Sequence, residues 1–471
     1  MHLTELDALF AFLAAAAVTA ILTPFTMRFA RKVGAVDRPR ERGLSDRPVP
    51  LLGGLAIFAG VLVAALIWLP AQEASVTVVN VHVIVRHGHH MHVVVHHHKV
   101  LHEVVHWYGV LLAAAVITVV GAVDDRFDLH PLVKLAGQTV AAVIAVHYGV
   151  VVKDVAVPFV GLLQFPNAGS AITVVALVAM MNIVNFSDGV DGLAAGVCGI
   201  IAIALALIAI SLYHNEGDHH LPSLAPAVFA AIIAGGALGF LVHNFPPASS
   251  FMGDCGANLL GLLMGCLAVE ATVKTEVVVS FVLPLILLTV PFLDTTFVVL
   301  KRLKYRRPIY LSDSEHFHHR MARIGFSPRR TIAYLYAWTI MLAGLALALR
   351  FIPYSDHHGH FNTGWTLVLV ALGALVLAAS VYLVYLLEIL KFRRVHTMRL
   401  RRMRPMATDA EIERDVTKHL ETGEMEVVDL PAPEGPRQPA TGRFPRPADA
   451  QGESMRSAGA PGAPAPQRGA P

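Results

Sequence analysis

Apolar runs of membrane-spanning length recur from the N-terminus to about residue 390, and they restrict this chain to one class of fold. A helix needs about 20 apolar residues to cross a bilayer, and its backbone groups must pair within the membrane. We therefore predict an all-α polytopic integral membrane protein with about eleven transmembrane helices. The predicted spans are 7–29, 51–70, 108–123, 132–150, 170–186, 192–213, 223–243, 256–272, 277–299, 331–351 and 364–390.

The composition agrees with this class. The chain is 55% hydrophobic and 15% charged, whereas soluble domains carry about 25% charged residues. Its net charge of +3 is too small and too unevenly placed to indicate nucleic acid, so we predict no such partner. Three cysteines (Cys198, Cys255 and Cys266) lie in or beside apolar runs without paired spacing. We interpret them as small buried residues rather than as a disulfide framework or a zinc site.

The lysines and arginines predict the topology. They concentrate in alternate loops, above all in 30–50, in 300–330 and after residue 391. Because cytoplasmic loops are enriched in these residues, we predict an outside N-terminus and a cytoplasmic C-terminus. The first apolar run lacks the features of a cleavable signal peptide, so we expect it to be retained as a helix.

Four acidic or histidine-containing stretches fall on the predicted inner side, at helix ends or in loops. A single aspartate at a helix end is most simply a cap. Several such stretches on one face instead indicate a shared polar site, since charged groups are costly in the bilayer centre. The stretches contain Asp124, Asp125 and Asp128, then Asp188 and Asp191 with Asn182 and Asn185, then Asp254, then His316, His318, His319 and Arg320.

These residue types suit one kind of chemistry. Carboxylates and carboxamides are oxygen ligands for Mg²⁺, which is usually held together with substrate phosphates. Lys134 and the basic loop 301–330 are placed to bind phosphate groups. The pattern therefore predicts phosphoryl transfer at the inner membrane surface, where a metal bridges phosphate oxygens and a carboxylate prepares the nucleophile.

In order and spacing, these motifs resemble those of the polyprenyl-phosphate N-acetylhexosamine-1-phosphate transferases of glycosyltransferase family 4. The resemblance covers residues 1–390 and includes a first inner loop with Asp37-Arg-Pro and Gly53-Gly54. Two positions depart from the family pattern, namely Ser45 in place of a histidine and Ala257 in place of a serine. The matching motifs are Asp124-Asp125-x-x-Asp128 with Lys134, Asn182-x-x-Asn185-x-x-Asp188-Gly-x-Asp191, Met252-Gly253-Asp254, and His316-x-His318-His319-Arg320.

The resemblance implies an enzyme that transfers a sugar 1-phosphate from a UDP-N-acetylhexosamine to undecaprenyl phosphate and releases UMP. It implies Mg²⁺, with Mn²⁺ as the alternative, held by Asn185 and Asp254. It also implies that Asp124 and Asp125 deprotonate or orient the lipid phosphate, and that Asp188 and Asp191 shape the nucleotide pocket. Lys134 would bind phosphate, and Asn182 is assigned to substrate binding. The implied location is the bacterial inner (plasma) membrane, with the site on the cytoplasmic face.

The histidine motif favours UDP-GlcNAc as the donor. The stretch from His316 to Arg320 resembles the version in enzymes that take UDP-GlcNAc more than the version in enzymes that take UDP-MurNAc-pentapeptide. We keep the second donor as an alternative within the family and leave a homodimer open. A polytopic transporter is the alternative from another class, but its ionisable groups are expected near the membrane midplane.

Two segments lie outside this picture. Residues 71–107 form a histidine-rich extracytoplasmic loop that we interpret as low-complexity sequence, with metal binding, a pH response or a short hairpin as alternatives. Within it His102-Glu-Val-Val-His106 matches a metalloprotease pattern, which we attribute to composition. Residues 391–471 comprise a basic juxtamembrane segment and a Pro-, Ala- and Gly-rich tail that we predict to be disordered.

Overall fold

The chain divides into two units, residues 1–412 and 413–471, and only the first contains described residues. The computed structural model describes residues 3–37, 48–70, 73–87, 90–152, 154–157, 161–165, 167–215, 223–273, 327–354 and 362–382, with Thr408 and Glu411. The predicted span 277–299, the first inner loop from 38 to 47 and the C-terminal tail therefore fall outside the described residues, apart from those two positions.

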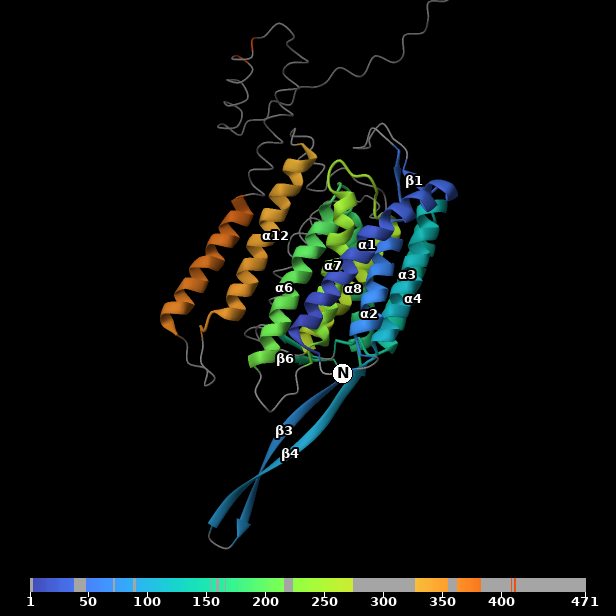
Figure 1. The fold of residues 1–471 in the computed structure, drawn as a ribbon. Helices are drawn as coiled ribbons and strands as arrows, with labels where there is room; N and C mark the ends of the chain where they lie inside the picture. The colour runs from blue at the N-terminus through green and yellow to red at the C-terminus, as the bar shows by residue number, and fades with distance from the viewer. Residues whose placement is uncertain are drawn as a thin grey trace, which may run out of the picture. The chain divides into compact units, whose positions relative to one another are not determined.

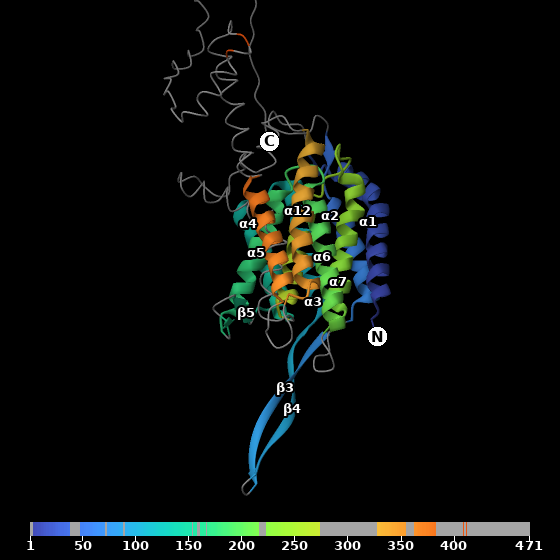
Figure 2. The same cartoon turned by 90° about the vertical axis from the view of Figure 1, so that its left-hand side faces the viewer.

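Helices make up most of the described chain and lie side by side in a bundle (Figures 1 and 2). Of those described, eight are long and apolar enough to cross a membrane, while α2 and α4 are shorter. The helices are α1 (Glu5–Val33), α2 (Gly53–Trp68), α3 (Trp107–Phe127), α4 (Pro131–His147), α5 (Gly169–Ser187), α6 (Leu193–Asn215), α7 (Ala225–Asn244), α8 (Gly253–Val273), α12 (Pro328–Phe351) and an unlabelled helix Thr363–Tyr382.

The helical part has the character expected of a polytopic membrane protein. Ten of the predicted spans coincide with described helices, and their ends differ mostly by a few residues. The last predicted span, 364–390, is described as a helix as far as Tyr382. The total number of spans and the side on which each terminus lies remain predictions.

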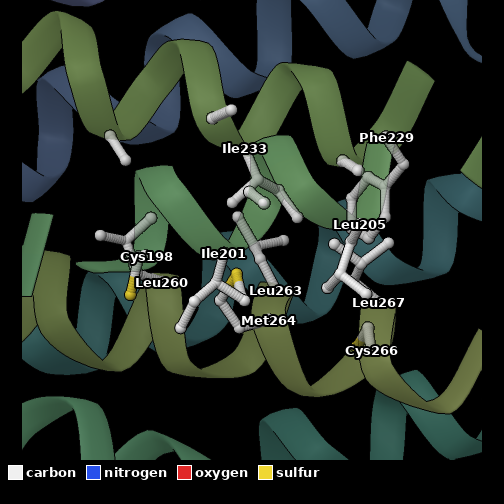
Figure 3. Packing of buried hydrophobic residues seen from close by; sticks show 14 of the residues in the cluster. Cys198, Ile201, Leu205, Phe229, Ile233, Leu260, Leu263, Met264, Cys266 and Leu267 are labelled. Carbon is white, nitrogen blue, oxygen red and sulfur yellow. The ribbon is translucent and has the colours of Figure 1, made fainter. Parts of the chain in front are cut away.

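The core is formed where α6, α7 and α8 meet. Leu205 of α6 lies there beside Phe229 of α7 and Leu267 of α8, and Ile201, one turn earlier in α6, lies beside Leu263 of α8 (Figure 3). Helix α7 is apolar on all sides and buried along most of its length, as expected for a helix surrounded by others. All three cysteines are free and buried, which confirms the prediction that they are small buried residues.

Helix α8 packs against α2, α3 and α5, and its first turn carries Asp254. The approach of α3 is especially close. A Cβ atom added to Gly121 would lie 2.4 Å from the Cα atom of Cys255. Small residues allow such backbone contact between membrane helices. The glycine therefore brings the last turn of α3, with Asp124 and Asp125, against the first turn of α8.

The start of α4 is fixed by its own sequence. Pro131 occupies the first turn, where the missing N–H costs nothing, and the ring of His130 accepts a hydrogen bond of 3.3 Å from the Leu132 N–H. Helix α12 begins in a similar way, with Ser327 as its N-cap. Because only a short turn separates α3 from α4, the first turn of α4 returns beside the last turn of α3.

The described strands form three antiparallel pairs, two of which are short. These are β1 (Val36–Asp37) with β2 (Val49–Pro50), and β5 (Asp154–Val157) with β6 (Gly161–Gln164). The third pair, β3 (Glu73–His87) with β4 (His90–Val105), is a long ribbon between α2 and α3 (Figure 1). The histidine-rich segment therefore adopts the hairpin that was an alternative in the sequence interpretation, and at a greater length than expected.

The same ribbon excludes the metalloprotease reading. That motif needs both histidines on one helical face with the glutamate between them. In the structure His102 and Glu103 lie in strand β4, and His106 is the N-cap of α3. The resemblance to the protease motif is therefore a result of composition, as the sequence interpretation held.

Candidate active site

One end of the bundle gathers almost all the described site residues that the sequence predicted. Helices α3 and α5 end there, whereas α4, α6 and α8 begin there. Asp124 and Asp125 lie in the last turn of α3, and Lys134 lies in the first turn of α4. Asn182 and Asn185 are in the last turns of α5, Asp188 is its C-cap, Asp191 follows in the turn to α6, and Asp254 opens α8.

Lys134 is the centre of the first group of contacts. Its Nζ lies 2.5 Å from Oδ2 of Asp254 and 3.1 Å from Oδ2 of Asp124. The Asp124 side chain is only 6% exposed, whereas those of Lys134 and Asp254 are 21% and 27% exposed. The pair of Lys134 and Asp254 is thus partly buried and still accessible from one side. Partial burial makes its attraction stronger than that of an ion pair in bulk water.

Asn185 completes this group from α5. Its Nδ2 donates a hydrogen bond of 2.6 Å to Oδ1 of Asp254, so both oxygens of that carboxylate are held. We refer to Asp124, Lys134, Asn185 and Asp254 as the lysine-centred cluster. Its members come from four helices, α3, α4, α5 and α8, and they lie up to 130 positions apart in the chain.

Asp125 has a different surrounding from its neighbour Asp124. Its Oδ1 accepts a hydrogen bond of 2.7 Å from the Asp254 N–H, and its Oδ2 accepts one of 3.3 Å from the Cys255 N–H. Asp125 therefore caps the N-terminus of α8, whose free N–H groups and dipole favour a negative charge. Gly253 has a φ of +67°, and a Cβ there would lie 2.3 Å from Oδ2 of Asp125, so only glycine suits this position.

The second group of acidic residues is the turn between α5 and α6, residues 188–192, which we call the aspartate turn. Oδ2 of Asp191 accepts a hydrogen bond of 2.9 Å from the Ala248 N–H, in the loop between α7 and α8. The Gly192 N–H donates to Oδ1 of Asn244 at 2.9 Å, and its carbonyl accepts from the Tyr336 hydroxyl at 2.5 Å. The turn is thus fixed mainly through its backbone, by α7 and α12.

Asp188, just beyond the end of α5, is a carboxyl whose pKa is perturbed. Burial raises the pKa of its carboxyl well above the ordinary value. The charges of Asp254, Asp125 and Asp191 raise that pKa further. The carboxylates at the end of α3 and the start of α8 are therefore electrostatically coupled to those of the aspartate turn. Together these carboxylates carry more negative charge than the single ammonium of Lys134 can neutralise.

The donor set of this end of the bundle fits a hard divalent cation. It consists of carboxylate and carboxamide oxygens, and an ammonium group already lies between two of the carboxylates, so positive charge is stabilised at that point. Among the described residues, no three or more His, Cys, Asp or Glu side chains are arranged to hold a metal ion by themselves. A site completed by substrate phosphates, as is usual for Mg²⁺, agrees with both observations.

Four polar residues that sequence analysis overlooked take part in this architecture. Gln138 and Asn258 bond to each other at 2.8 Å beneath the lysine-centred cluster, and Asn244 and Tyr336 hold the aspartate turn. For the first two a signal existed. Gln138 follows Lys134 by four residues and Asn258 follows Asp254 by four, so each shares a helical face with a predicted site residue. The roles of Asn244 and Tyr336 follow from tertiary contacts alone.

Asn182 and the histidine motif complete the comparison with the predicted set. Nδ2 of Asn182 donates to Oε1 of Gln138 and to the carbonyl of Val178, both at 2.8 Å, so this group faces the bundle interior. His316, His318, His319 and Arg320 lie outside the described residues, and their assignment to substrate binding stays a prediction.

Comparisons with known proteins agree with this picture. A model of "Glycosyl transferase family 4" matches residues 107–272, which contain every described residue of the lysine-centred cluster and the aspartate turn. A decaprenyl-phosphate N-acetylglucosaminephosphotransferase of Mycobacterium tuberculosis is 33% identical over 391 residues, covering 80% of this chain and 88% of the relative.

Two further relatives extend the comparison. A probable undecaprenyl-phosphate N-acetylglucosaminyl 1-phosphate transferase of Bacillus subtilis is 32% identical over 346 residues, covering 72% of this chain and 84% of the relative. A phospho-N-acetylmuramoyl-pentapeptide-transferase of Moorella thermoacetica is 29% identical over 366 residues, covering 73% of this chain and 99% of the relative.

Proposed function

The chain belongs to glycosyl transferase family 4, and from that premise we propose that it transfers N-acetylglucosamine 1-phosphate from UDP-GlcNAc to undecaprenyl phosphate. It is a phosphotransferase of the polyprenyl-phosphate type, like the relatives named above. The UDP-linked donor, the dependence on Mg²⁺ and a role in starting a cell-envelope glycan belong to the proposal. The transporter alternative is not kept, because the relatives are enzymes.

The names of the relatives support a polyprenyl phosphate as the acceptor and N-acetylglucosamine as the sugar, but they differ in the length of the prenyl chain. Those at 32–33% identity act on a decaprenyl or undecaprenyl phosphate and on N-acetylglucosamine. The relative that acts on a muramoyl-pentapeptide is less similar, at 29% identity. We therefore favour N-acetylglucosamine as the sugar, and treat the length of the prenyl chain as a variable to be tested.

The lysine-centred cluster is the observation that carries the proposal. Transfer of a sugar phosphate joins two negatively charged phosphates, so the main task of the protein is to position them and neutralise their charge. Lys134 supplies positive charge 2.5 Å from Asp254, at the end of the bundle where four helices meet. An ammonium so placed can bind a phosphate that approaches the exposed side of the pair.

Asp254 and Asn185 are the residues we assign to Mg²⁺, with the Asp124 carboxylate, which shares Lys134 with Asp254, as a further oxygen donor. Their side chains are adjacent in the structure, and their oxygens suit this ion. When bound, the ion would neutralise the diphosphate of the donor and polarise its phosphorus atoms. Binding of the substrates and proton transfer are assigned to side chains of the protein.

The two adjacent aspartates receive different roles. In the reaction, an oxygen of the lipid phosphate bonds to the phosphorus that bears the sugar, and the bond from that phosphorus to the bridging oxygen breaks, so that UMP leaves. Asp124 is assigned to accept a proton from the lipid phosphate or to orient it. Asp125 is assigned to hold α8, because both of its oxygens accept backbone N–H groups. We assign Asp188 and Asp191 to the nucleotide and the His316–Arg320 stretch to the sugar nucleotide.

The proposed location is the bacterial plasma membrane, with the site on the cytoplasmic face. The apolar helices and the family support a multi-pass membrane protein. The cytoplasmic face is inferred from the sequence, because lysine and arginine concentrate in the loops that the topology predicts on the same side as the site residues. It is also the side on which soluble UDP-sugars are available.

The test is release of UMP by the purified full-length protein in detergent. UDP-GlcNAc, undecaprenyl phosphate and Mg²⁺ are supplied together, and each is omitted in turn. We expect UMP only when all three are present, and loss of the signal when EDTA removes the cation. Decaprenyl phosphate replaces the acceptor in a parallel series to measure the preference for prenyl length.

Other donors serve as controls for the sugar assignment. Release of UMP from UDP-MurNAc-pentapeptide, but not from UDP-GlcNAc, would assign the protein to the family members that use UDP-MurNAc-pentapeptide as the donor. No release with any UDP-amino sugar and either acceptor would contradict the proposed function as a whole.

A further inference from the structure

Beneath the lysine-centred cluster, three carboxamides form a continuous chain of hydrogen bonds across three helices. Nδ2 of Asn182 in α5 donates to Oε1 of Gln138 in α4, at 2.8 Å. Nε2 of Gln138 donates to Oδ1 of Asn258 in α8, again at 2.8 Å. Nδ2 of Asn258 donates to the backbone carbonyl of Asp254 at 2.8 Å. We call these three residues the amide chain.

The amide chain lies in the apolar interior. Gln138 and Asn258 are each 1% exposed, among helices whose other side chains are mostly apolar. A carboxamide buried without partners is costly, and an apolar side chain of similar size avoids that cost. Gln138 instead uses both its oxygen and its nitrogen, so it joins α5 to α8 through directed bonds rather than through packing alone.

The spacing along each helix ties this chain to the site. Gln138 follows Lys134 by four residues, Asn258 follows Asp254 by four, and Asn182 precedes Asn185 by three. Residues three or four apart share a helical face. Each amide is therefore one turn deeper than a member of the lysine-centred cluster, on the same three helices. A shift or rotation of one helix that separated Lys134, Asn185 and Asp254 would also break the amide chain.

We propose that Gln138 is a positioning residue, which through the amide chain holds α4, α5 and α8 at the separation that keeps Asp254 in place for its ligands. The inference rests on the proposed function, because it concerns the same reaction. Gln138 does not touch the reacting groups. It acts through Asn258, which bonds to the carbonyl of Asp254, and through Asn182, which lies one turn from Asn185.

The primary test replaces Gln138 by methionine, which keeps an unbranched side chain of similar length and removes both hydrogen bonds. Thr339→Val is the matched control. Thr339 is fully buried in α12, and its Oγ1 donates a hydrogen bond of 2.8 Å to the Leu335 carbonyl, within its own helix. Both proteins are purified at full length, and their folding is compared by size exclusion and thermal unfolding.

Two measurements separate positioning from a loss of folded protein. The first is kcat and KM for UMP release at several Mg²⁺ concentrations. The second is the affinity for Mn²⁺ in the presence of UDP-GlcNAc but without the lipid acceptor, followed by the electron paramagnetic resonance signal of free Mn²⁺ against a protein-free blank. For Q138M we expect kcat/KM and Mn²⁺ affinity to fall about 10-fold or more, as when a residue that orients a ligand is lost. T339V should match wild type in both.

A double variant tests whether the amides act together. If they form one device, Q138M with Asn258→Leu should lose no more activity than the worse single variant, because the chain is already broken. Independent losses that multiply would contradict the inference. So would a Q138M protein with wild-type kcat, KM and Mn²⁺ affinity, or one in which only the yield or thermal stability falls.

The wild-type protein distinguishes the two levels of failure. If it releases UMP and binds Mn²⁺ while Q138M is unaffected, only the positioning role is wrong. If the wild-type protein does neither, the proposed function fails, and the inference fails with it.

Discussion

The lysine-centred cluster and the aspartate turn lie at the same end of the bundle, yet they are held in different ways. In the cluster, side chains bind side chains, with Lys134 between Asp124 and Asp254 and Asn185 on the other oxygen of Asp254. In the turn, the backbone of Gly192 is bound by Asn244 and Tyr336. The charges of the cluster are paired with one another, whereas the turn is held by neutral groups, including the Ala248 N–H that donates to Asp191.

This difference predicts how each region responds to ligands. Phosphates or a cation that enter the cluster must replace existing contacts of Lys134 or Asp254, so substitutions there should change the chemical step. The turn already holds Asp188 close to other negative charges, and its pKa is raised as a result. A ligand that brings positive charge would relieve that repulsion. Substitutions around the turn should therefore affect binding and stability more than chemistry.

The largest effect is expected for Asp254→Asn in the cluster. The change keeps the size of the side chain but removes a negative charge that bonds Lys134 and is assigned to Mg²⁺. We expect kcat to fall about 10³-fold, the order seen when a preorganised electrostatic group is removed. UMP release at saturating Mg²⁺ measures it. Activity within a few-fold of wild type would remove Asp254 from the metal assignment.

The next largest fall in kcat is expected for Asp124→Asn, and Asp125→Asn is the variant to compare with it. If Asp124 handles the proton of the lipid phosphate, its loss should lower kcat about 100-fold, at the low end for acid–base catalysis. An asparagine at position 125 can still accept a hydrogen bond from the Asp254 N–H, so that variant should lose less than about 10-fold. UMP release by both proteins under the same conditions decides the matter. The opposite order would exchange the two roles.

The sequence predicted most of the helices and most of the cluster because both follow from local patterns. Apolar runs fix the spans, and the charged residues at their inner ends mark the site. What it could not predict depends on the packing of separate helices. Asp125 was paired with Asp124 in function, but the close contact of α3 with α8 at Gly121 turns it toward backbone N–H groups. The partner of Gln138 likewise lies 120 positions away in the chain.

The ribbon β3–β4 illustrates another limit of sequence reasoning. Alternating valine and histidine is compatible with strands, but the abundance of histidine favoured an interpretation as low-complexity sequence. The register pairs Glu73 with Val105 and His87 with His90, so the two strands match over nearly their full length. In this segment the alternation was the more informative pattern, because period two is the basic repeat of a strand.

In the aspartate turn, Asp188→Asn should change how the stability of the protein depends on pH. A carboxyl with a raised pKa in the folded state binds its proton more tightly there than in the unfolded state. The folded state is therefore penalised above the ordinary carboxyl pKa, near 4, and not below it. Asp188→Asn removes this penalty. In EDTA the variant should unfold a few degrees above wild type at pH 8, and the gain should shrink as the pH falls toward 4.

Thermal unfolding of both proteins across this pH range, in detergent and without Mg²⁺, is the measurement. A gain that stays constant with pH would mean that the charge of Asp188 is not its source. A loss of stability at pH 8 would show that the carboxylate is stabilised by a partner instead, and would contradict the contrast drawn between the two regions.

The smallest effect is expected for Tyr336→Phe, which removes the hydroxyl bonded to the Gly192 carbonyl at 2.5 Å and keeps the ring. One such hydrogen bond contributes about 0.5–1.5 kcal/mol, and its loss would loosen the turn without changing any carboxylate. We expect KM for UDP-GlcNAc to rise about 3-fold while kcat stays near wild type. Tyr213→Phe, at the far end of α6, is the matched control and should leave both constants unchanged. If Y336F lowered kcat and left KM unchanged, the turn would take part in the chemical step, and the division between a reacting cluster and a binding turn would have to be abandoned.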